Sequence, residues 1–364
     1  MSWQAAAAAS FVACWLAILA LRPLAVAVDL VDRPGGRKTH RGEIPVVGGL
    51  AMFIGIVLGV GLLAIPGPSA AAFLAACAIL VTVGLIDDRF ELSPWTRLPG
   101  QIAAVLVLIL GSGATVTTLG DPFGTGLIHF SGMSSIVFTT FIVVSAINAF
   151  NMLDGMDGLA GTAALTSLLA IALISAISGQ SLTLAISMVM IGAVCAFLLF
   201  NLPLRPNTSV HCFMGDAGST LLGFAVAWLC IQISQDRVPA VTPVTTFWFV
   251  ALPLYELVWS TARRIIRGVS PFKADTNHFH HLLLKAGFDV RGAFAVFATL
   301  TFAFAGIGLL CQHYQVADRF SLLLVTACGF GTTLLMYRAR LLRAIVPQSV
   351  RRIKRPDTLG QRSP

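Results

Sequence analysis

The stretch GMSSIVFTTFIVVSAINAF, residues 132–150, carries no charged side chain and is long enough to cross a lipid bilayer as one helix. Similar apolar runs recur along the whole chain. The predicted membrane spans are residues 6–28, 46–65, 69–86, 99–119, 132–150, 159–177, 182–200, 218–234, 243–262, 292–312 and 320–337. Only 11% of the residues are charged, against about 25% in ordinary soluble proteins. The sequence therefore predicts an all-α polytopic membrane protein with about 11 transmembrane helices.

The basic residues predict how these spans are oriented. All but Arg22, Arg237 and Arg319 of the 24 lysines and arginines lie in alternate connections and in the C-terminal tail. Because basic loops remain on the cytoplasmic side, we expect the N-terminus outside and the C-terminus in the cytoplasm. The net charge of +8 then indicates contact with an anionic lipid bilayer and no binding of nucleic acid.

The domain organisation follows from the same pattern. We expect residues 1–338 to form one integral-membrane domain and residues 339–364 to form a basic cytoplasmic tail. The expected cytoplasmic active-site loops are residues 29–45, 87–98, 151–158, 201–217 and 262–291. The seven cysteines show no CxxC pair, so neither disulfides nor redox chemistry is indicated.

Polar residues gather directly after the opening stretch, in NAFNMLDGMDGLAG (148–161). Asn148, Asn151, Asp154 and Asp157 follow one another at three-residue steps, so successive pairs can share a helix face. Oxygen ligands on one face suit Mg²⁺, which takes one or two protein ligands and completes its shell with phosphate and water. The alternative is a motif that only caps and packs a helix.

Two further acidic motifs occupy predicted cytoplasmic span ends. GLIDDRFELSP (84–94) ends a span with Asp87 and Asp88, and the alternative is a helix-end pair neutralised by Arg89. FMGDAGSTLLGF (213–224) starts a span with Asp216 between glycines, where backbone amides can approach a phosphate. The alternative there is a simple N-cap.

Two basic loops accompany the acids. DRPGGRKTHRGEIPVVGG (32–49) and SPFKADTNHFHHLLLKAGF (270–288) offer lysine, arginine and histidine donors that suit a diphosphate or a nucleotide. The HxHH pattern also resembles a zinc motif, but no thiols accompany it and the nearby acids suit a harder cation. The first loop could also serve only as a topology determinant.

These five motifs, in this order and spacing, resemble the polyprenyl-phosphate N-acetylhexosamine-1-phosphate transferases over about residues 29–290. The closest likeness is to the branch that acts on UDP-GlcNAc and undecaprenyl phosphate. The resemblance implies transfer of N-acetylglucosamine 1-phosphate, giving undecaprenyl-diphospho-GlcNAc and UMP, with Mg²⁺ or Mn²⁺ as cofactor. It also implies a multi-pass protein of the bacterial inner membrane with a periplasmic N-terminus and a cytoplasmic active site. The step would be the first lipid-linked one in O-antigen or related polysaccharide synthesis.

The resemblance assigns roles residue by residue. The implied metal ligands are Asn151 and Asp216, and the implied catalytic acids are Asp87, Asp88, Asp154 and Asp157. The implied substrate-binding residues are Lys38, Asn148, Arg263, Arg264, His278, His280 and His281. One departure is Glu256 in ALPLYEL, where the family often has an aspartate.

Other functions stay open at this point. A sister enzyme could use another UDP-N-acetylhexosamine of the FucNAc or QuiNAc type. A CDP-alcohol phosphatidyltransferase would need an AR pair after the first DG, and none is present. A polytopic transporter would be expected to carry polar residues deep in its spans or an internal repeat. A homo-oligomer is compatible with the sequence.

Overall fold

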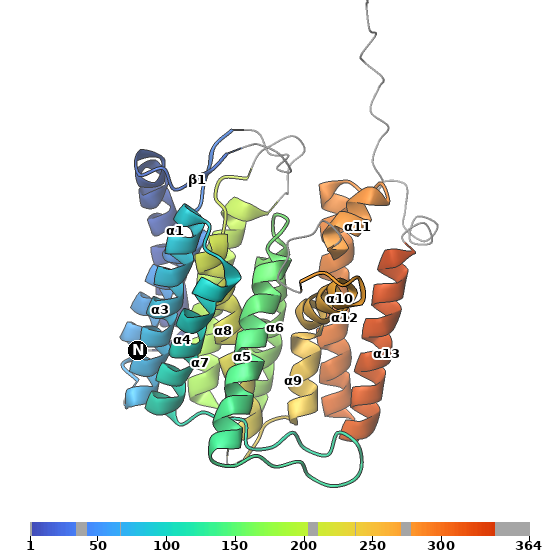
Figure 1. Cartoon of the computed structure of the whole chain (residues 1–364). Helices are drawn as coiled ribbons and strands as arrows, with labels where there is room; N and C mark the ends of the chain where they lie inside the picture. The colour runs from blue at the N-terminus through green and yellow to red at the C-terminus, as the bar shows by residue number, and fades with distance from the viewer. Residues whose placement is uncertain are drawn as a thin grey trace, which may run out of the picture.

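The computed structural model describes residues 2–33, 42–65, 67–202, 210–236, 238–270 and 278–338. In these residues the chain is a bundle of helices that run roughly side by side (Figure 1). The one sheet of the described residues pairs two-residue strands, β1 (Val31–Asp32) and β2 (Ile44–Pro45), in antiparallel register. The predicted all-helical class is confirmed.

The helices follow the apolar runs closely. They are α1 (Trp3–Ala27), α2 (Gly48–Leu63), α3 (Pro68–Phe90), α4 (Pro94–Ser112), α5 (Met133–Leu153), α6 (Leu159–Ile177), α7 (Ser181–Asn201), α8 (Gly215–Gln235), α9 (Pro243–Phe249), α10 (Ala251–Ile266), α11 (Phe279–Lys285), α12 (Val290–His313) and α13 (Asp318–Tyr337). Within the described part of the chain, nine helices are long and apolar enough to cross a membrane, and α2 is a shorter apolar helix. The chain is therefore polytopic, while the number of eleven spans and the orientation of the termini stay predictions.

The apolar run 243–262 differs from the predicted single span. Two helices, α9 and α10, meet at Val250, whose φ and ψ of −116° and 11° are not helical. Pro253 has no N–H to bond the carbonyl of Phe249, as a continuous helix would require. That carbonyl instead accepts a 2.6 Å hydrogen bond from the Ser167 hydroxyl of α6. Because of this proline, α10 does not continue along the axis of α9. It instead runs across the bundle (Figure 1).

The predicted span 99–119 is shifted relative to the helix α4. Ser93 accepts a hydrogen bond from the Thr96 N–H, and Pro94 occupies the first turn, so the helix begins five residues earlier than predicted. It ends at Ser112 because Gly113 has a left-handed φ of 70°. The residues from there to α5 form an extended loop instead of helix (Figure 1).

The helix α8 forms the centre of the bundle. Its 18-residue apolar window is 94% buried, more than that of any other candidate span in the described residues. Glycines let neighbouring helices approach its first turn. A Cβ on Gly84 of α3 would lie 2.8 Å from the carbonyl carbon of Asp216, so α3 packs directly on the α8 backbone. This contact brings the acidic end of α3 beside the start of α8.

Candidate active site

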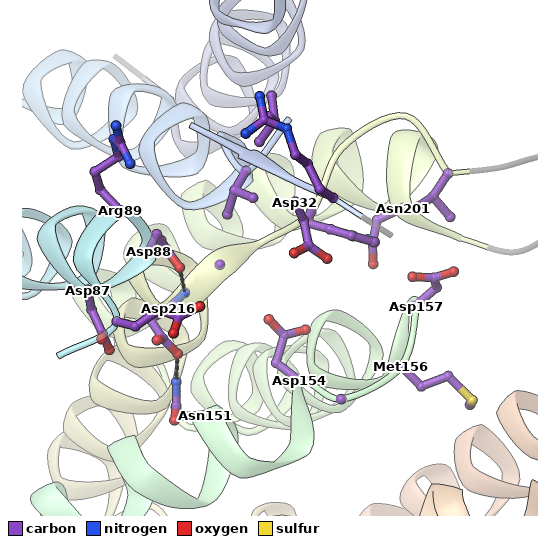
Figure 2. A pocket seen from close by; sticks show the side chains of 18 of the residues that line it. Asp32, Asp87, Asp88, Arg89, Asn151, Asp154, Met156, Asp157, Asn201 and Asp216 are labelled. Atoms are coloured by element: carbon purple, nitrogen blue, oxygen red, sulfur yellow. Dashed lines mark hydrogen bonds between the residues drawn. The ribbon is translucent and has the colours of Figure 1, made fainter. Parts of the chain in front are cut away.

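The acidic motifs meet at one end of the bundle around a cavity of about 1710 Å³. Its lining comes from the ends of α3, α5 and α8, from the β1 region, and from α11. Figure 2 shows Asp216 between Asp88 and Asn151, with Asp154 and Asp157 directed into the cavity from the segment that follows α5. Asp88 and Asp216, which are 128 residues apart in the chain, therefore face one space.

Asp216 lies in the first turn of α8 and makes the central contacts of the site. Asn151, at the end of α5, donates from its Nδ2 to the Asp216 carboxylate and to the Ser219 hydroxyl, the latter at 3.1 Å. The two residues that the resemblance implies as metal ligands are thus in direct contact. Rotating the Asn151 amide about its terminal bond would present Oδ1 in place of Nδ2 to a cation.

Asp88 joins α3 to the start of α8. Its two carboxylate oxygens accept the backbone N–H groups of Asp216 at 2.7 Å and Ala217 at 3.3 Å. The first amides of a helix lack partners within the helix, and the N-terminal end of the helix dipole favours an anion. Asp88 therefore positions the backbone that carries Asp216.

Asp87 shares a cation with Asp216. Its side chain is 3% exposed and accepts from the Leu92 N–H at 2.7 Å and from Arg97 Nη1 at 2.6 Å. The same Nη1 lies 3.2 Å from the second oxygen of Asp216. Sequence reasoning did not find Arg97. The Ser93–Pro94 helix start was the available indication, because it places Arg97 in the first turn of α4, facing back toward the end of α3.

Asp154 and Asp157 flank a sharp turn. Burial, followed by the negative charges of Asp88 and Asp157, raises the pKa of Asp154 to about 7. Gly158 closes the turn with a φ of 79°, and its N–H donates to Asn201 Oδ1 at 2.8 Å. Asn201 in turn donates to the Cys212 carbonyl at 2.9 Å. It was also missed, since a single asparagine at a span end carries no pattern.

Asn148 contacts a neighbouring helix. Its amide donates to Gln101 Oε1 of α4 and to the Val144 carbonyl, both at 2.8 Å. It is not among the described residues that line the cavity. The structure thus shows a packing contact for Asn148, and the substrate-binding role that the resemblance implied stays a prediction.

The three histidines of the last motif divide into two groups. His280 and His281 line the cavity, whereas His278 hydrogen-bonds to Glu256. Burial, followed by His281 and His278, lowers the pKa of His280 to about 3, so this imidazole is neutral at physiological pH. A neutral imidazole still has one N–H donor, and the substrate-binding role of His280 stays a prediction. Its Nε2 is buried without a hydrogen-bond partner, and its ring packs on Gly155.

The remaining substrate-binding candidates are Arg263, Arg264 and Lys38. Arg263 and Arg264, in the last turn of α10, are buried, and Arg263 hydrogen-bonds to the Tyr337 hydroxyl. Lys38 lies outside the described residues, so the structure does not test it.

The described lining residues suit a divalent cation with few protein ligands. The acids among them are Asp29, Asp32, Asp87, Asp88, Glu91, Asp154, Asp157 and Asp216, against the arginines Arg33, Arg89 and Arg97. In this part of the chain no three His, Cys, Asp or Glu side chains form a complete ligand set. Mg²⁺ needs only one or two protein ligands when phosphates supply the others. The Arg97 guanidinium between Asp87 and Asp216 shows that a positive group fits among these carboxylates.

Comparison with known proteins assigns this site to a family. Residues 70–234 match glycosyl transferase family 4, and this range contains the three acidic motifs. The undecaprenyl-phosphate alpha-N-acetylglucosaminyl 1-phosphate transferase of Escherichia coli O157:H7 is 35% identical over 335 residues, which cover 92% of this chain and 90% of the relative. The chain belongs to glycosyl transferase family 4.

Other relatives of the same name agree with this assignment. The protein from Salmonella typhimurium is 35% identical over 313 residues, covering 86% of this chain and 85% of the relative. The protein from Haemophilus influenzae is 34% identical over 314 residues, covering 85% and 87%. The family predicted from five sequence motifs is thus confirmed, and this family 4 glycosyl transferase is a multi-pass membrane protein.

Proposed function

We propose that this protein transfers N-acetylglucosamine 1-phosphate from UDP-GlcNAc to undecaprenyl phosphate, giving undecaprenyl-diphospho-GlcNAc and UMP. The observation that carries the proposal is the acidic cavity at one end of the helices, in a chain whose relatives named for this transfer align over about nine tenths of it. One integral-membrane domain, residues 1–338, performs the transfer at the cytoplasmic face of the bacterial inner membrane. The product begins an O-antigen or a related cell-surface polysaccharide.

The chemistry exchanges one phosphoanhydride for another, so its main demand is to bring two anions together. Asp216 and Asn151 would hold Mg²⁺, or Mn²⁺, which would screen the diphosphate and the leaving UMP. Before substrate arrives, Asp87 and Asp216 share the single positive charge of Arg97. Asp88 keeps the first amides of α8 in place beneath this arrangement.

Proton transfer falls to Asp154 in this proposal. The oxygens of Asp87 and Asp88 are occupied by backbone amides and by Arg97, whereas Asp154 faces the cavity. A phosphate monoester keeps its second proton up to pH of about 6. A carboxylate with a pKa of about 7 is matched to accept that proton from undecaprenyl phosphate as it attacks.

The nucleotide-sugar side is assigned to the histidine motif. Neutral His280 offers a ring nitrogen to a neutral polar group, such as a carbonyl or a hydroxyl, more readily than to a phosphate. His281, Arg263, Arg264 and Lys38 remain the proposed partners of the diphosphate, with Lys38 resting on its motif alone.

The test incubates the detergent-purified chain with undecaprenyl phosphate, Mg²⁺ and a panel of UDP-sugars. Release of UMP and the mass of the lipid product are measured. We expect UDP-GlcNAc to be the best donor. A preference for a FucNAc or QuiNAc donor would select the sister activity, and no UMP from any UDP-N-acetylhexosamine would overturn the proposal.

A further inference from the structure

Glu256 lies on a buried polar face of α10. Together with Ser260 and Arg263 it follows a helical spacing of four and then three residues, and all three are less than 9% exposed. On the opposite face, Val258 and Ile265 are 60% and 61% exposed. A carboxylate at 3% exposure is costly unless hydrogen bonds and a cationic or donor partner compensate for the lost water.

The compensation comes from the first turn of α11, 22 residues further along the chain. Glu256 Oε1 lies 2.7 Å from His278 Nδ1, and the Phe279 N–H donates to the two carboxylate oxygens at 3.1 and 3.3 Å. His278 is the N-cap residue of α11, and its own side chain makes no capping bond to the helix. A backbone N–H in the first turn of α11 is thus hydrogen-bonded by Glu256, a side chain of α10.

The contact of Glu256 with His278 and Phe279 determines the positions of the histidines that line the cavity. The ring of His278 is parallel to that of His280 within 5°, with centroids 5.9 Å apart, and His280 rests on Gly155. Phe279 and Leu283 of the same short helix are fully buried. A carboxylate at Nδ1 also holds a proton on that nitrogen, which leaves Nε2 as the second polar atom of His278. Glu256, His278, His280 and Gly155 therefore form a continuous series of contacts that leads to the acidic turn.

We propose that Glu256 is a positioning residue that anchors the first turn of α11. It thereby fixes the positions of His280 and His281, the cavity-lining histidines that contact the nucleotide-sugar. The identity of that ligand rests on the proposed function. An aspartate at this position is shorter by one methylene, roughly 1.5 Å of reach. It would have to draw α11 toward α10 or lose one of the two bonds. The glutamate is therefore matched to the distance between α10 and α11 in this chain.

The experiment compares Glu256→Ala, Glu256→Asp and Glu256→Gln with the control Tyr255→Phe. Tyr255 is the preceding residue of α10, and its hydroxyl donates to the Val325 carbonyl of α13 instead of to α11. Amide hydrogen exchange reports the order of α11 without any substrate. Steady-state kinetics report the KM of UDP-GlcNAc and of undecaprenyl phosphate separately.

In Glu256→Ala we expect exchange in residues 279–285 to accelerate at least about tenfold, since a bond to a charged group is lost. The KM of UDP-GlcNAc should rise by a similar factor while the KM of undecaprenyl phosphate stays unchanged. Glu256→Asp should fall between Glu256→Ala and the native protein, and Tyr255→Phe should leave α11 exchange unchanged. Glu256→Gln should keep α11 ordered, because an amide can accept from Phe279 and donate to His278 Nδ1 in the other tautomer.

Unchanged amide hydrogen exchange in α11 would overturn the proposal that Glu256 anchors this helix. Faster exchange throughout the bundle in all three Glu256 variants would overturn it as well. A loosened α11 with an unchanged KM for UDP-GlcNAc would overturn its part in nucleotide-sugar binding. Failure of the transferase proposal is distinguishable, because the native chain would then release no UMP while the exchange readout still reports on the anchor.

Discussion

At the scale of single residues, the contacts of the site converge on Asp216. Asn151 and Arg97 approach its carboxylate from α5 and α4, and Asp88 holds its backbone N–H. Asp216 thus meets an amide and a cation at its carboxylate and an acid at its backbone N–H, from three other helices. Charge changes at these positions should separate metal binding from helix positioning.

Asp216→Asn should leave the helix start intact and abolish most activity, and the remaining activity should need more Mg²⁺. The amide keeps the shape of the side chain but removes the charge that a hard cation prefers. Asp88→Asn should lower turnover with little change in the Mg²⁺ requirement, because Asp88 contacts backbone amides. Activity against Mg²⁺ concentration, beside thermal unfolding, measures both. A native metal curve for Asp216→Asn would favour the N-cap alternative.

Arg97→Gln should shift the metal curve in the opposite direction from Asp216→Asn. Removing the guanidinium leaves Asp87 and Asp216 without their shared cation, so Mg²⁺ should bind more tightly while turnover falls at saturating metal. The measurement is Mg²⁺-dependent thermal stabilisation without substrate, together with activity. Arg97→Lys, which retains the charge, is the matched control. Weaker Mg²⁺ binding in Arg97→Gln would contradict this account.

Asp154 should give the enzyme a pH dependence near neutrality. With a pKa of about 7, its ionised fraction and hence kcat/KM should rise with pH through that value. The stability of the folded chain should change in the opposite direction. The unfolded chain releases this proton near pH 3.8 and the folded chain near 7, so the free energy of unfolding falls as pH rises between these values. In Asp154→Asn the rise in rate should disappear and the fall in stability should become smaller, and a rate profile that kept its rise in this variant would assign the base elsewhere.

At the scale of elements, the site depends on how closely α3 approaches α8. The end of α3 carries Asp87 and Asp88, and α8 begins with Asp216, so the distance between the acids is set by helix packing. Gly84 makes that approach possible because a Cβ there would collide with the backbone of α8. The neighbouring α4 contributes Arg97 only because Ser93 and Pro94 start it early.

Gly84→Ala should therefore destabilise the protein by about 1–3 kcal/mol and lower activity further than the stability loss explains. The control is Gly61→Ala in α2, where a Cβ would meet no atom within 4 Å and helix propensity favours alanine. The measurements are thermal unfolding and UMP release of both variants. Equal behaviour of the two variants would show that the α3–α8 contact is not limiting.

At the scale of the whole molecule, β1 and α11, which line the acidic cavity, lie at the opposite end of the bundle from the loop 113–132 (Figure 1). The described arginines Arg33, Arg89 and Arg97 line the cavity, which is on the predicted cytoplasmic side. In the loop, Phe123 and Leu127 are exposed at 67% and 64%. The two ends of the bundle should therefore lie on different sides of the membrane.

Cysteine labelling in intact cells tests this orientation. Leu127→Cys should react with a membrane-impermeant thiol reagent, whereas Phe90→Cys, at the cavity end of α3, should react only after lysis. The native cysteines are buried or half-buried in the structure, so they should contribute little background. The reverse pattern would place the active site outside the cytoplasm.

Much of this protein could be predicted from its sequence, because hydropathy and helix spacing are local properties. The apolar runs located α6 at 159–177, as observed, and the motif order identified the family. Local patterns failed where a boundary depended on caps, as in α4, or where a proline released a carbonyl to another helix, as Pro253 did at Phe249. The short helix α11 was hidden in a predicted loop.

Only the tertiary structure decided which residues of the site work together. Arg97 reaches Asp216 across 119 residues, and Asn201 connects the turn at Gly158 to the segment before α8. The sequence located these residues at span ends, but a contact between two helices depends on their packing, and here glycines and prolines set that packing. Glu256 illustrates the limit. From the sequence it was an acid of the wrong length for the family motif, and in the fold that length matches the distance from α10 to His278.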